Sequence, residues 1–361
     1  MLIICGSWLG KRGFYEAEIE NVVFYHSFVE IEKIEPVSFT IFSYDLSNET
    51  LSLNLKKSEL PPIVIVKIKK FRKISKSEGS FRLLHLNNAL QDNEFILGVL
   101  RVRKLIEKGT VYQINLTNRF DFEFQGDPLS LFFRFYENQP VPYAFFLNLN
   151  DFFIVSGSME LFLEKRGNTI ISKPIKGTSK SHAFLKNSQK DKAENLMITD
   201  MMRNDIGRIA NIGSVRVSEL FKITKYRTLY QMHSTVEGNT DKSIIEILQA
   251  TFPPASVTGA PKRKAVEMID TLEPHARSYY CGCAGLIKNK TDFTLSVLIR
   301  TAVGMGNRLS YYAGCGIVWD SEPERELREL YLKVKAFYPD INTMIESEKF
   351  CYKKLENLGD V

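Results

Sequence analysis

The sequence is poor in cysteine and has no long apolar run. Only five of its 361 residues are cysteines, and their odd number and scattered positions do not suggest a disulfide framework. No apolar stretch approaches the roughly 18–20 residues that a membrane helix needs. The apolar start, Met1–Gly10, precedes its basic residues, whereas in a signal peptide the basic residues come first. We therefore expect a cytoplasmic protein in a reducing compartment, without a membrane partner.

Several common catalytic signatures are also absent. The sequence contains no GxxxxGK[ST] phosphate loop, no GxSxG nucleophile turn and no HExxH metal motif. Gly304-Met305-Gly306 lacks the third glycine of a dinucleotide fingerprint, and the five histidines show no paired ligand spacing. These absences argue against a nucleotide-binding protein, a serine hydrolase and a zinc enzyme.

The composition is that of an ordinary globular chain with a diffuse positive charge. Hydrophobic residues make up 44% and charged residues 25% of the sequence, which excludes a disordered or fibrous chain. The net charge of +6 is compatible with an anionic substrate. The densest basic run, 67–76, is interpreted as a solvated loop. A nucleic-acid surface would interleave stacking aromatic residues, and only Phe71 is present, so no nucleic-acid partner is expected.

The order of apolar patterns predicts an α+β fold with antiparallel sheets. Short β-branched or aromatic runs predict strands at 22–25, 39–44, 63–68, 111–124, 143–149, 152–156 and 169–172. Helical spacing predicts helices at 92–108, 190–210 and 323–337. The elements alternate without a regular βαβ repeat. We divide the chain into a strand-rich N-terminal part of the same fold (1–90), a catalytic domain (91–340) and a C-terminal tail (341–361).

The segment 174–178, Pro-Ile-Lys-Gly-Thr, places a lysine on a short, constrained loop directly after an expected strand. An amine held between a proline and a glycine turn can act as a nucleophile or as an anion anchor once it is buried. Lys176 is therefore a candidate reactive residue. On the pentapeptide alone, a lysine in a surface turn is the alternative interpretation.

Two charged helices carry candidate metal ligands. In the helix expected at 190–210, Glu194 lies at the edge of the face formed by Ala193, Leu196, Met197, Asp200 and Met201. In the last helix, Glu326, Glu329 and Lys333 have the spacing i, i+3, i+7, so two carboxylates and an ammonium share one face. Carboxylate oxygens suit a hard cation such as Mg²⁺. Solvated helices with internal salt bridges are the alternative interpretation of both.

Three smaller features complete the set. Ser321 with Glu324 is interpreted as a capping box at the start of the last helix. Gly314-Cys315-Gly316 follows an expected strand, and its glycines let backbone N–H groups approach a carboxylate or phosphate. Arg300 ends another expected strand and can contact a carboxylate through two hydrogen bonds. A strand-end bulge and a surface arginine are the alternatives.

Together these segments resemble the chorismate-utilising enzymes. From about Tyr112 to Phe337 the chain is similar to aminodeoxychorismate synthase component I and anthranilate synthase component I. The matching segments include PIKGT at 174–178, KDKAENLMITDMMRNDIGR at 190–208, FPPASVTGAPKRKAVEMIDTLEP at 252–274 and AGCGIVWDSEPERELRE at 313–329. Their number, order and spacing argue strongly against a chance match. The first 80 residues match only at Ser43-Tyr44-Asp45.

The resemblance implies the fold of that family: two large antiparallel sheets forming a sandwich-like core with helices outside and the site between the sheets. It implies that Glu194 and Glu329, with Glu326 beside them, hold Mg²⁺. Lys176 would add to chorismate at ring C2 as the C4 hydroxyl leaves, and Glu160 would be the general acid or base for that hydroxyl. The implied substrate contacts are Gly177, Thr178, Tyr280, Arg300, Gly314, Gly316 and Lys333.

One residue discriminates between two branches of this family. Anthranilate synthases typically carry PIAGT, whereas aminodeoxychorismate synthases carry PIKGT, as at Lys176 here. The resemblance therefore implies conversion of chorismate and ammonia to 4-amino-4-deoxychorismate, a precursor of 4-aminobenzoate and folate. Anthranilate synthase component I is the alternative. A separate glutamine amidotransferase subunit is expected to supply the ammonia, because the chain has no Cys-His-Glu hydrolase pattern.

Two departures from the family pattern concern proton transfer. Leu161 stands where the family's SPERF-like segment has an arginine, and Gln231 stands where anthranilate synthases carry a histidine. His233 is given no catalytic role. Two other interpretations are weaker. Lys176 and the GAPK segment at 259–262 argue against an isochorismate or salicylate synthase, and the joint presence of the site residues argues against a non-catalytic docking subunit.

Overall fold

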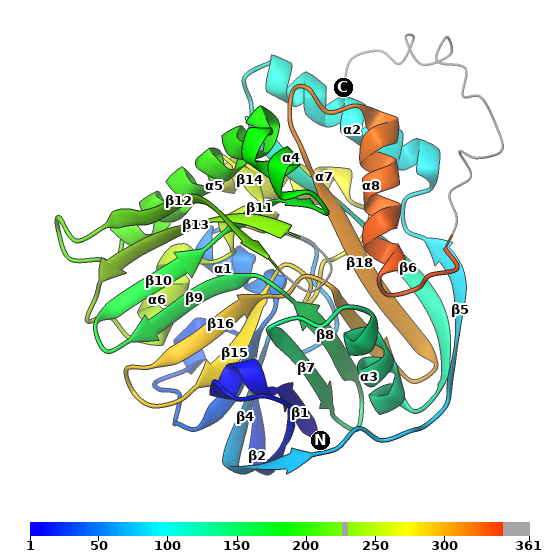
Figure 1. Ribbon diagram of the computed structural model, residues 1–361, viewed down its shortest axis with the longest axis vertical. Coiled ribbons are helices and arrows are strands. Elements are labelled where there is room, and N and C mark those ends of the chain that lie inside the picture. The colour runs from blue at the N-terminus through cyan, green and yellow to red at the C-terminus, as the bar shows by residue number, and fades with distance from the viewer. Residues whose placement is uncertain (226–229, 342–361) are drawn as a thin grey trace.

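The computed structural model describes residues 1–225 and 230–341, and this part contains eighteen strands and eight α-helices (Figure 1). From residue 342 on, the expected C-terminal tail lies outside the described residues. The strands are β1 (Leu2–Cys5), β2 (Phe14–Tyr25), β3 (Ser38–Phe42), β4 (Ile63–Ile74), β5 (Phe81–Asn88), β6 (Gln113–Gly126), β7 (Tyr143–Asn148), β8 (Phe153–Ser158), β9 (Leu161–Arg166), β10 (Thr169–Lys173), β11 (Ile175–Ser179), β12 (Arg216–Lys225), β13 (Tyr230–Asn239), β14 (Gly259–Ala260), β15 (Cys283–Ile287), β16 (Phe293–Val297), β17 (Thr301–Met305) and β18 (Arg308–Ile317). The α-helices are α1 (Ser47–Thr50), α2 (Asp92–Glu107), α3 (Pro128–Asn138), α4 (His182–Asn187), α5 (Gln189–Gly207), α6 (Ile244–Thr251), α7 (Lys262–Leu272) and α8 (Pro323–Lys335). None of these described helices is long and apolar enough to cross a membrane.

The strands form one continuous antiparallel ribbon. Pairing runs in the order β12–β13–β10–β9–β16–β15–β3–β4–β2–β1–β7–β8–β17–β18–β6–β5. β11 also pairs with β13, and β14 with β6. The expected α+β class with antiparallel strands and outer helices is confirmed. Hydrogen bonds nevertheless connect the strands into a single network, so the two halves of the sandwich are not separate sheets.

The middle of this ribbon lies between two hydrophobic cores. In β4, Val64 and Val66 belong to one core, whereas Ile63 and Ile65 belong to the other. Successive side chains of a strand point to opposite faces, so both faces of β4 are buried. This explains why residues 63–66 are all apolar instead of alternating with polar residues.

The basic run at 67–76 is not a loop, and that prediction was wrong. Residues 67–74 continue β4 and pair with β2. The basic side chains meet acidic ones across the strands: Lys67 contacts Glu20 at 3.3 Å and Lys70 contacts Glu18 at 3.1 Å. Cross-strand pairs of opposite charge stabilise a sheet. The acidic partners precede the run by about fifty residues, so the run itself does not reveal them.

The helices lie outside the strands and place the segments of the site. α5 packs on β11, β12 and β13, while α8 packs on β18 and against α2 (Figure 1). α7 contacts β14 and β6. The helix predicted at 92–108 is confirmed as α2, which begins with a capping box between Gln91 and Glu94. The helices predicted at 190–210 and 323–337 are confirmed as α5 and α8.

Candidate active site

Lys176 lies on a distorted strand. The expected loop at 174–178 is wrong, because Ile175–Ser179 forms β11 and pairs with β13. The register shifts between Ile175 and Thr178, and Gly177 has a φ of +85°. A Cβ at Gly177 would lie 3.0 Å from the Cβ of Asp191, so a larger residue would be both strained and crowded here. This bulge holds the half-buried Lys176 in its position. The predicted contact by the Thr178 side chain lies outside the described part of the chain.

The Lys176 ammonium and the side-chain amide of Gln113 both lie close to Gly316. A Cβ at Gly316 would lie 2.5 Å from Gln113 Nε2 and 3.3 Å from Lys176 Nζ. Glycine is therefore required here so that both polar groups can approach the backbone of β18. Gly314-Cys315-Gly316 lies within β18 and pairs in regular register with β6, so it is not a strand-end bulge.

Glu160 lies in the same region and is almost fully buried. Burial raises the pKa of its carboxyl to about 7, although a hydrogen bond from Ser256, the Lys176 charge and the Ile175 N–H all favour the ionised form. A carboxyl that titrates near neutral pH can give or take a proton during a reaction. Lys176 and Glu160, both predicted from the sequence, are therefore brought together.

Three carboxylates from two helices form a second group. Glu194 comes from α5, whereas Glu326 and Glu329 come from α8. The Lys190 ammonium lies 3.8 Å from Glu194 Oε1 and 3.8 Å from Glu326 Oε1, so it bridges the two helices. Lys176 and Glu329 are also close enough to influence the titration of Glu194. The predicted metal ligands therefore gather beside Lys176.

The electrostatics of the three carboxylates differ. Burial raises the pKa of Glu194, despite the positive charges of Lys176 and Lys190. Burial likewise raises the pKa of Glu326. The Lys333 ammonium, 2.8 Å from Glu329, lowers the pKa of that carboxyl. At Glu194 and Glu326 burial outweighs the charges of the nearby lysines, and a divalent cation would add further positive charge.

The donor set fits Mg²⁺. Each of the three glutamates offers carboxylate oxygens, the ligand type this ion prefers. One ligand atom each from Cys315, Glu326 and Glu329 lie within 4.8 Å of one another. Glu194 is not one of these three, and its link to Glu326 is the Lys190 ammonium, which lies 3.8 Å from each carboxylate.

Ser321 orients one of these carboxylates instead of capping a helix. The capping-box prediction for Ser321 and Glu324 is wrong, since α8 has Glu322 at its N-cap and no side-chain cap. The Ser321 hydroxyl donates to Glu326 Oε1 at 2.8 Å and accepts from the Val318 N–H at 3.1 Å. The serine therefore positions Glu326.

Arg300 and Lys333 connect β18 with α8. The Arg300 guanidinium donates to the Lys333 carbonyl oxygen, and Lys333 Nζ donates to the Gly314 carbonyl oxygen at 2.7 Å. Arg300 does not end a strand as expected: β16 stops at Val297, and Arg300 has a φ of +53°. These two cations and Gly314 therefore belong to one contact group.

Tyr280 is packed differently from the other predicted contacts. Its ring stacks on Tyr312 at a centroid distance of 5.3 Å, within the second hydrophobic core. Burial raises the pKa of its hydroxyl. The described contacts of this ring are thus with the core, and its role toward a substrate stays a prediction.

Three residues of the site were not singled out from the sequence. They are Gln113 beside Gly316, Ser256 beside Glu160 and Lys190 between the helices. All three stand in segments that carried the family resemblance, at 112–117, 252–274 and 190–208, which is the signal that points to them.

The departures from the family pattern lie on β13 and β9. Gln231 pairs with Thr178 of β11 and donates through Nε2 to Met159 Sδ at 3.1 Å. His233 contacts the Thr224 hydroxyl at 2.9 Å, and burial lowers its pKa. Leu161 is buried at the start of β9.

Comparison with known proteins finds a matching family model and similar sequences. A family model described as chorismate binding enzyme matches residues 22–339. The chain is 39% identical over 246 residues to aminodeoxychorismate synthase component 1 of Salmonella typhimurium, covering 65% of this chain and 54% of that protein. It is 34% identical over 270 residues to anthranilate synthase component 1 of Saccharolobus solfataricus, covering 72% and 64%. The chain thus spans between about half and two thirds of these relatives.

Solved structures share the fold. Anthranilate synthase component I from Streptococcus pneumoniae superimposes with a TM-score of 0.72 at 23% identity, covering 85% of this chain and 82% of that one. A 2,3-dihydroxybenzoate-specific isochorismate synthase from Bacillus anthracis gives a TM-score of 0.74 at 20% identity, covering 93% and 94%. At these identities the likeness concerns the fold alone.

Proposed function

Because the chain belongs to the chorismate-binding enzymes, we propose that it aminates chorismate to 4-amino-4-deoxychorismate as an aminodeoxychorismate synthase component 1. One observation carries the proposal: the Lys176 amine projects toward Gly316 with the Glu160 carboxyl close by. This arrangement supports a role for Lys176 as the nucleophile and for Glu160 as the group that protonates the leaving hydroxyl. The resemblance to the PIKGT branch supports the same assignment.

The reaction splits one difficult displacement into two steps. The neutral Lys176 amine attacks ring C2, the double bonds shift, and the C4–O bond breaks as Glu160 protonates the departing hydroxyl to water. Ammonia then attacks C4, the double bonds shift back, and the C2–N bond breaks to release Lys176. The Glu160 carboxylate regains a proton from the new ammonium group. The net change is chorismate plus ammonia to 4-amino-4-deoxychorismate plus water.

The remaining residues bind and orient the substrate. Glu194, Glu326 and Glu329 would hold Mg²⁺, which supplies positive charge for the ring carboxylate of chorismate. Arg300 offers a guanidinium for a second carboxylate. Gly177, Thr178, Tyr280, Gly314, Gly316 and Lys333 are assigned to substrate contact on the family pattern. The Ser321 hydroxyl keeps Glu326 in place.

Ammonia requires a source outside the described site. We assign that role to a glutamine amidotransferase partner, which the designation component 1 of the relatives supports. The product would enter synthesis of 4-aminobenzoate and folate, and this assignment places the protein in the cytoplasm.

The test is to incubate the purified chain with chorismate, Mg²⁺ and ammonium at mildly alkaline pH and to identify the product by mass spectrometry. Ammonium replaces the partner, so the chain is tested alone. 4-Amino-4-deoxychorismate, convertible to 4-aminobenzoate by an added lyase, is the expected product. The Lys176→Ala variant is expected to lose this product while keeping the native circular dichroism spectrum.

Anthranilate synthase component 1 is the second candidate. The observation in its favour is the 34% identity to the Saccharolobus solfataricus protein. Lys176 argues against it, because that branch typically carries alanine at this position. Formation of anthranilate in the same assay would select this candidate and reject the first.

A further inference from the structure

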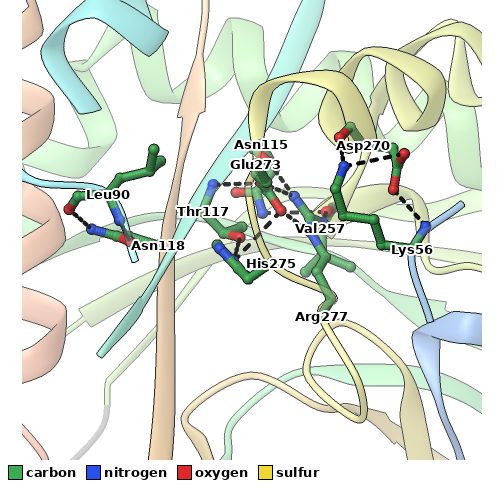
Figure 2. Close-up of polar contacts among 10 residues, drawn as sticks. All are labelled: Lys56, Leu90, Asn115, Thr117, Asn118, Val257, Asp270, Glu273, His275 and Arg277. Atoms are coloured by element: carbon green, nitrogen blue, oxygen red, sulfur yellow. Dashed lines mark hydrogen bonds and ion pairs between the residues drawn. The ribbon is translucent and has the colours of Figure 1, made fainter. Parts of the chain in front are cut away.

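A buried ion pair behind the site joins two of its segments. Glu273 caps the end of α7, and Arg277 follows in the next turn, each with a side chain 1% exposed. Arg277 Nε and Nη2 donate to the two Glu273 oxygens at 2.9 and 2.7 Å, which is a bidentate pair (Figure 2). Such a pair has a fixed geometry, because both planar groups are locked together.

Arg277 uses its remaining donors on two backbone carbonyls. Nη1 donates to the Val257 oxygen at 2.8 Å, and Nη2 donates to the Asn115 oxygen at 2.7 Å (Figure 2). Glu273 in turn accepts from the Thr117 N–H at 2.8 Å. The pair therefore fastens the turn Ala255–Val257 to the first residues of β6.

Asn115 adds two bonds between the same segments. Its N–H donates to the Thr258 carbonyl oxygen at 2.7 Å, and its side-chain amide donates to Val257 at 3.2 Å. None of these contacts reaches the candidate site directly. The fastened segments do: Ser256 precedes Val257 and hydrogen-bonds Glu160, while Gln113 precedes Asn115 by two residues and meets Lys176 at Gly316.

A stabilising role alone accounts poorly for this arrangement. Removing two charges from water costs about as much free energy as a buried pair returns, so such a pair is weak evidence for stability. It does fix the positions of the groups it joins. We propose that Arg277, held by Glu273, is a positioning residue that locks the turn Ala255–Val257 on β6 so that Ser256 meets the Glu160 carboxyl.

The inference rests on the proposed function only for the part that Glu160 plays in the reaction. The groups that face Glu160 are the Ser256 hydroxyl, the Lys176 ammonium and the Ile175 N–H. Arg277 influences the first of these through the backbone of Val257. Displacing the turn would remove the hydrogen bond from Ser256 and leave Glu160 easier to protonate.

The experiment is an infrared titration of the full chain without substrate. The difference between the wild type and Glu160→Gln isolates the Glu160 carboxyl stretch and gives its titration midpoint. Ser256→Ala is expected to raise this midpoint by about one pH unit, the equivalent of one hydrogen bond to a charged group. Arg277→Lys keeps the positive charge but loses the bidentate guanidinium geometry. It is also expected to raise the titration midpoint of Glu160.

The double variant and a control make the result specific. Ser256→Ala combined with Arg277→Lys should shift the midpoint no further than Ser256→Ala alone, because both act through one hydrogen bond. The control is Arg119→Lys, which alters an arginine on β6 that is paired with Asp121 at 3.0 Å. It should leave the midpoint unchanged.

Three results would overturn the inference: no shift in Ser256→Ala, no shift in Arg277→Lys, or shifts that add fully in the double variant. If Arg277→Lys does not fold, Glu273→Gln is titrated in its place and judged by the same criteria. Because no substrate is present, a wild-type chain that fails to aminate chorismate would refute the proposed function alone. If the chain aminates chorismate but Arg277→Lys leaves the Glu160 midpoint unchanged, only the positioning role is refuted.

Discussion

Glu160 makes the stability of the protein depend on pH. Its pKa is raised from 4.5 to about 7 by burial, so the folded state favours the protonated form. The stability that this group contributes is fully present below about pH 4.5 and is lost as the pH rises to 7. The loss amounts to about 3 kcal/mol. Glu160→Gln should remove it, so urea unfolding should show the variant gaining stability relative to the wild type between these pH values. A constant difference would contradict the buried carboxyl.

Lys176 can be tested with a substitution that keeps its charge. A guanidinium at this position retains the attraction for an anionic substrate but is not a useful nucleophile. Lys176→Arg is therefore expected to bind chorismate, measured by calorimetry, with an affinity within about tenfold of the wild type. Its amination rate should fall by about a thousandfold or more. A rate near that of the wild type would show that the lysine acts through charge and not by covalent addition.

Single site residues could be singled out from the sequence only where they form a recognisable motif with residues adjacent in the chain. Lys176 stands between a proline and a glycine, and Glu326 and Glu329 share a helical face, so local pattern made them candidates and the family resemblance favoured the site interpretation over a surface one. Gln113 and Ser256 acquire their places only when β6 and the turn Ala255–Val257 meet β18 and Glu160 in space. The spacing of residues along the chain does not predict these tertiary contacts.

The Lys190 ammonium occupies the gap between α5 and α8 that the proposed cation would share. A unit charge about 4 Å from a divalent cation contributes about 2 kcal/mol of repulsion in a well-solvated setting. Lys190→Gln should therefore tighten Mg²⁺ binding about thirtyfold in a calorimetric titration. The matched control is Lys186→Gln, an exposed lysine on α4. Equal effects of both substitutions would mean that only net charge matters.

α5 is anchored to α7 by a second buried pair. Lys262 Nζ lies 2.5 Å from Asp205 Oδ2 and also donates to the Thr251 carbonyl oxygen at 2.8 Å. Asp205→Asn leaves the buried ammonium without its counter-charge, and thermal unfolding should show a loss of about 3 kcal/mol. Asp200→Asn is the control on the same helix, because its pair with Arg203 is solvent-exposed. The control should change stability by less than about 1 kcal/mol.

Elements with strong periodicity were predicted well. The helix at 92–108 and the strands of the central segment are present, because their patterns reflect burial on one face or both. The loop at 67–76 was wrong because Lys67 and Lys70 find Glu20 and Glu18 on β2. The capping box was wrong because Ser321 bonds to Glu326 instead of closing the helix.

The two hydrophobic cores share their central strands and should unfold together. Val64 and Ile65 are neighbours in β4 but belong to different cores. Val64→Ala and Ile65→Ala should each lower the stability of the whole chain by about 2–4 kcal/mol. Calorimetry should show one transition for both variants, with equal calorimetric and van't Hoff enthalpies. Two transitions, with each substitution moving only one, would mean that the cores are independent.

The single ribbon was not predictable from sequence pattern. The family resemblance pointed to two sheets, and the strands themselves were mostly located. Their pairing depends on segments far apart in the chain, such as Phe42 with Cys283 and Ile3 with Phe146. The hydrophobic period and the composition of a strand indicate whether its faces are buried, but not which strand pairs with it.

The order of strands in the ribbon has a consequence for synthesis on the ribosome. The four strands β1 to β4 leave the exit tunnel before the other strands, yet they form the middle of the ribbon. Their outer neighbours, β7 and β15, end at Asn148 and Ile287. Until these arrive, both edges of the early strands stay open to other nascent chains. The protein is therefore expected to fold slowly and to depend on chaperones while it is being translated.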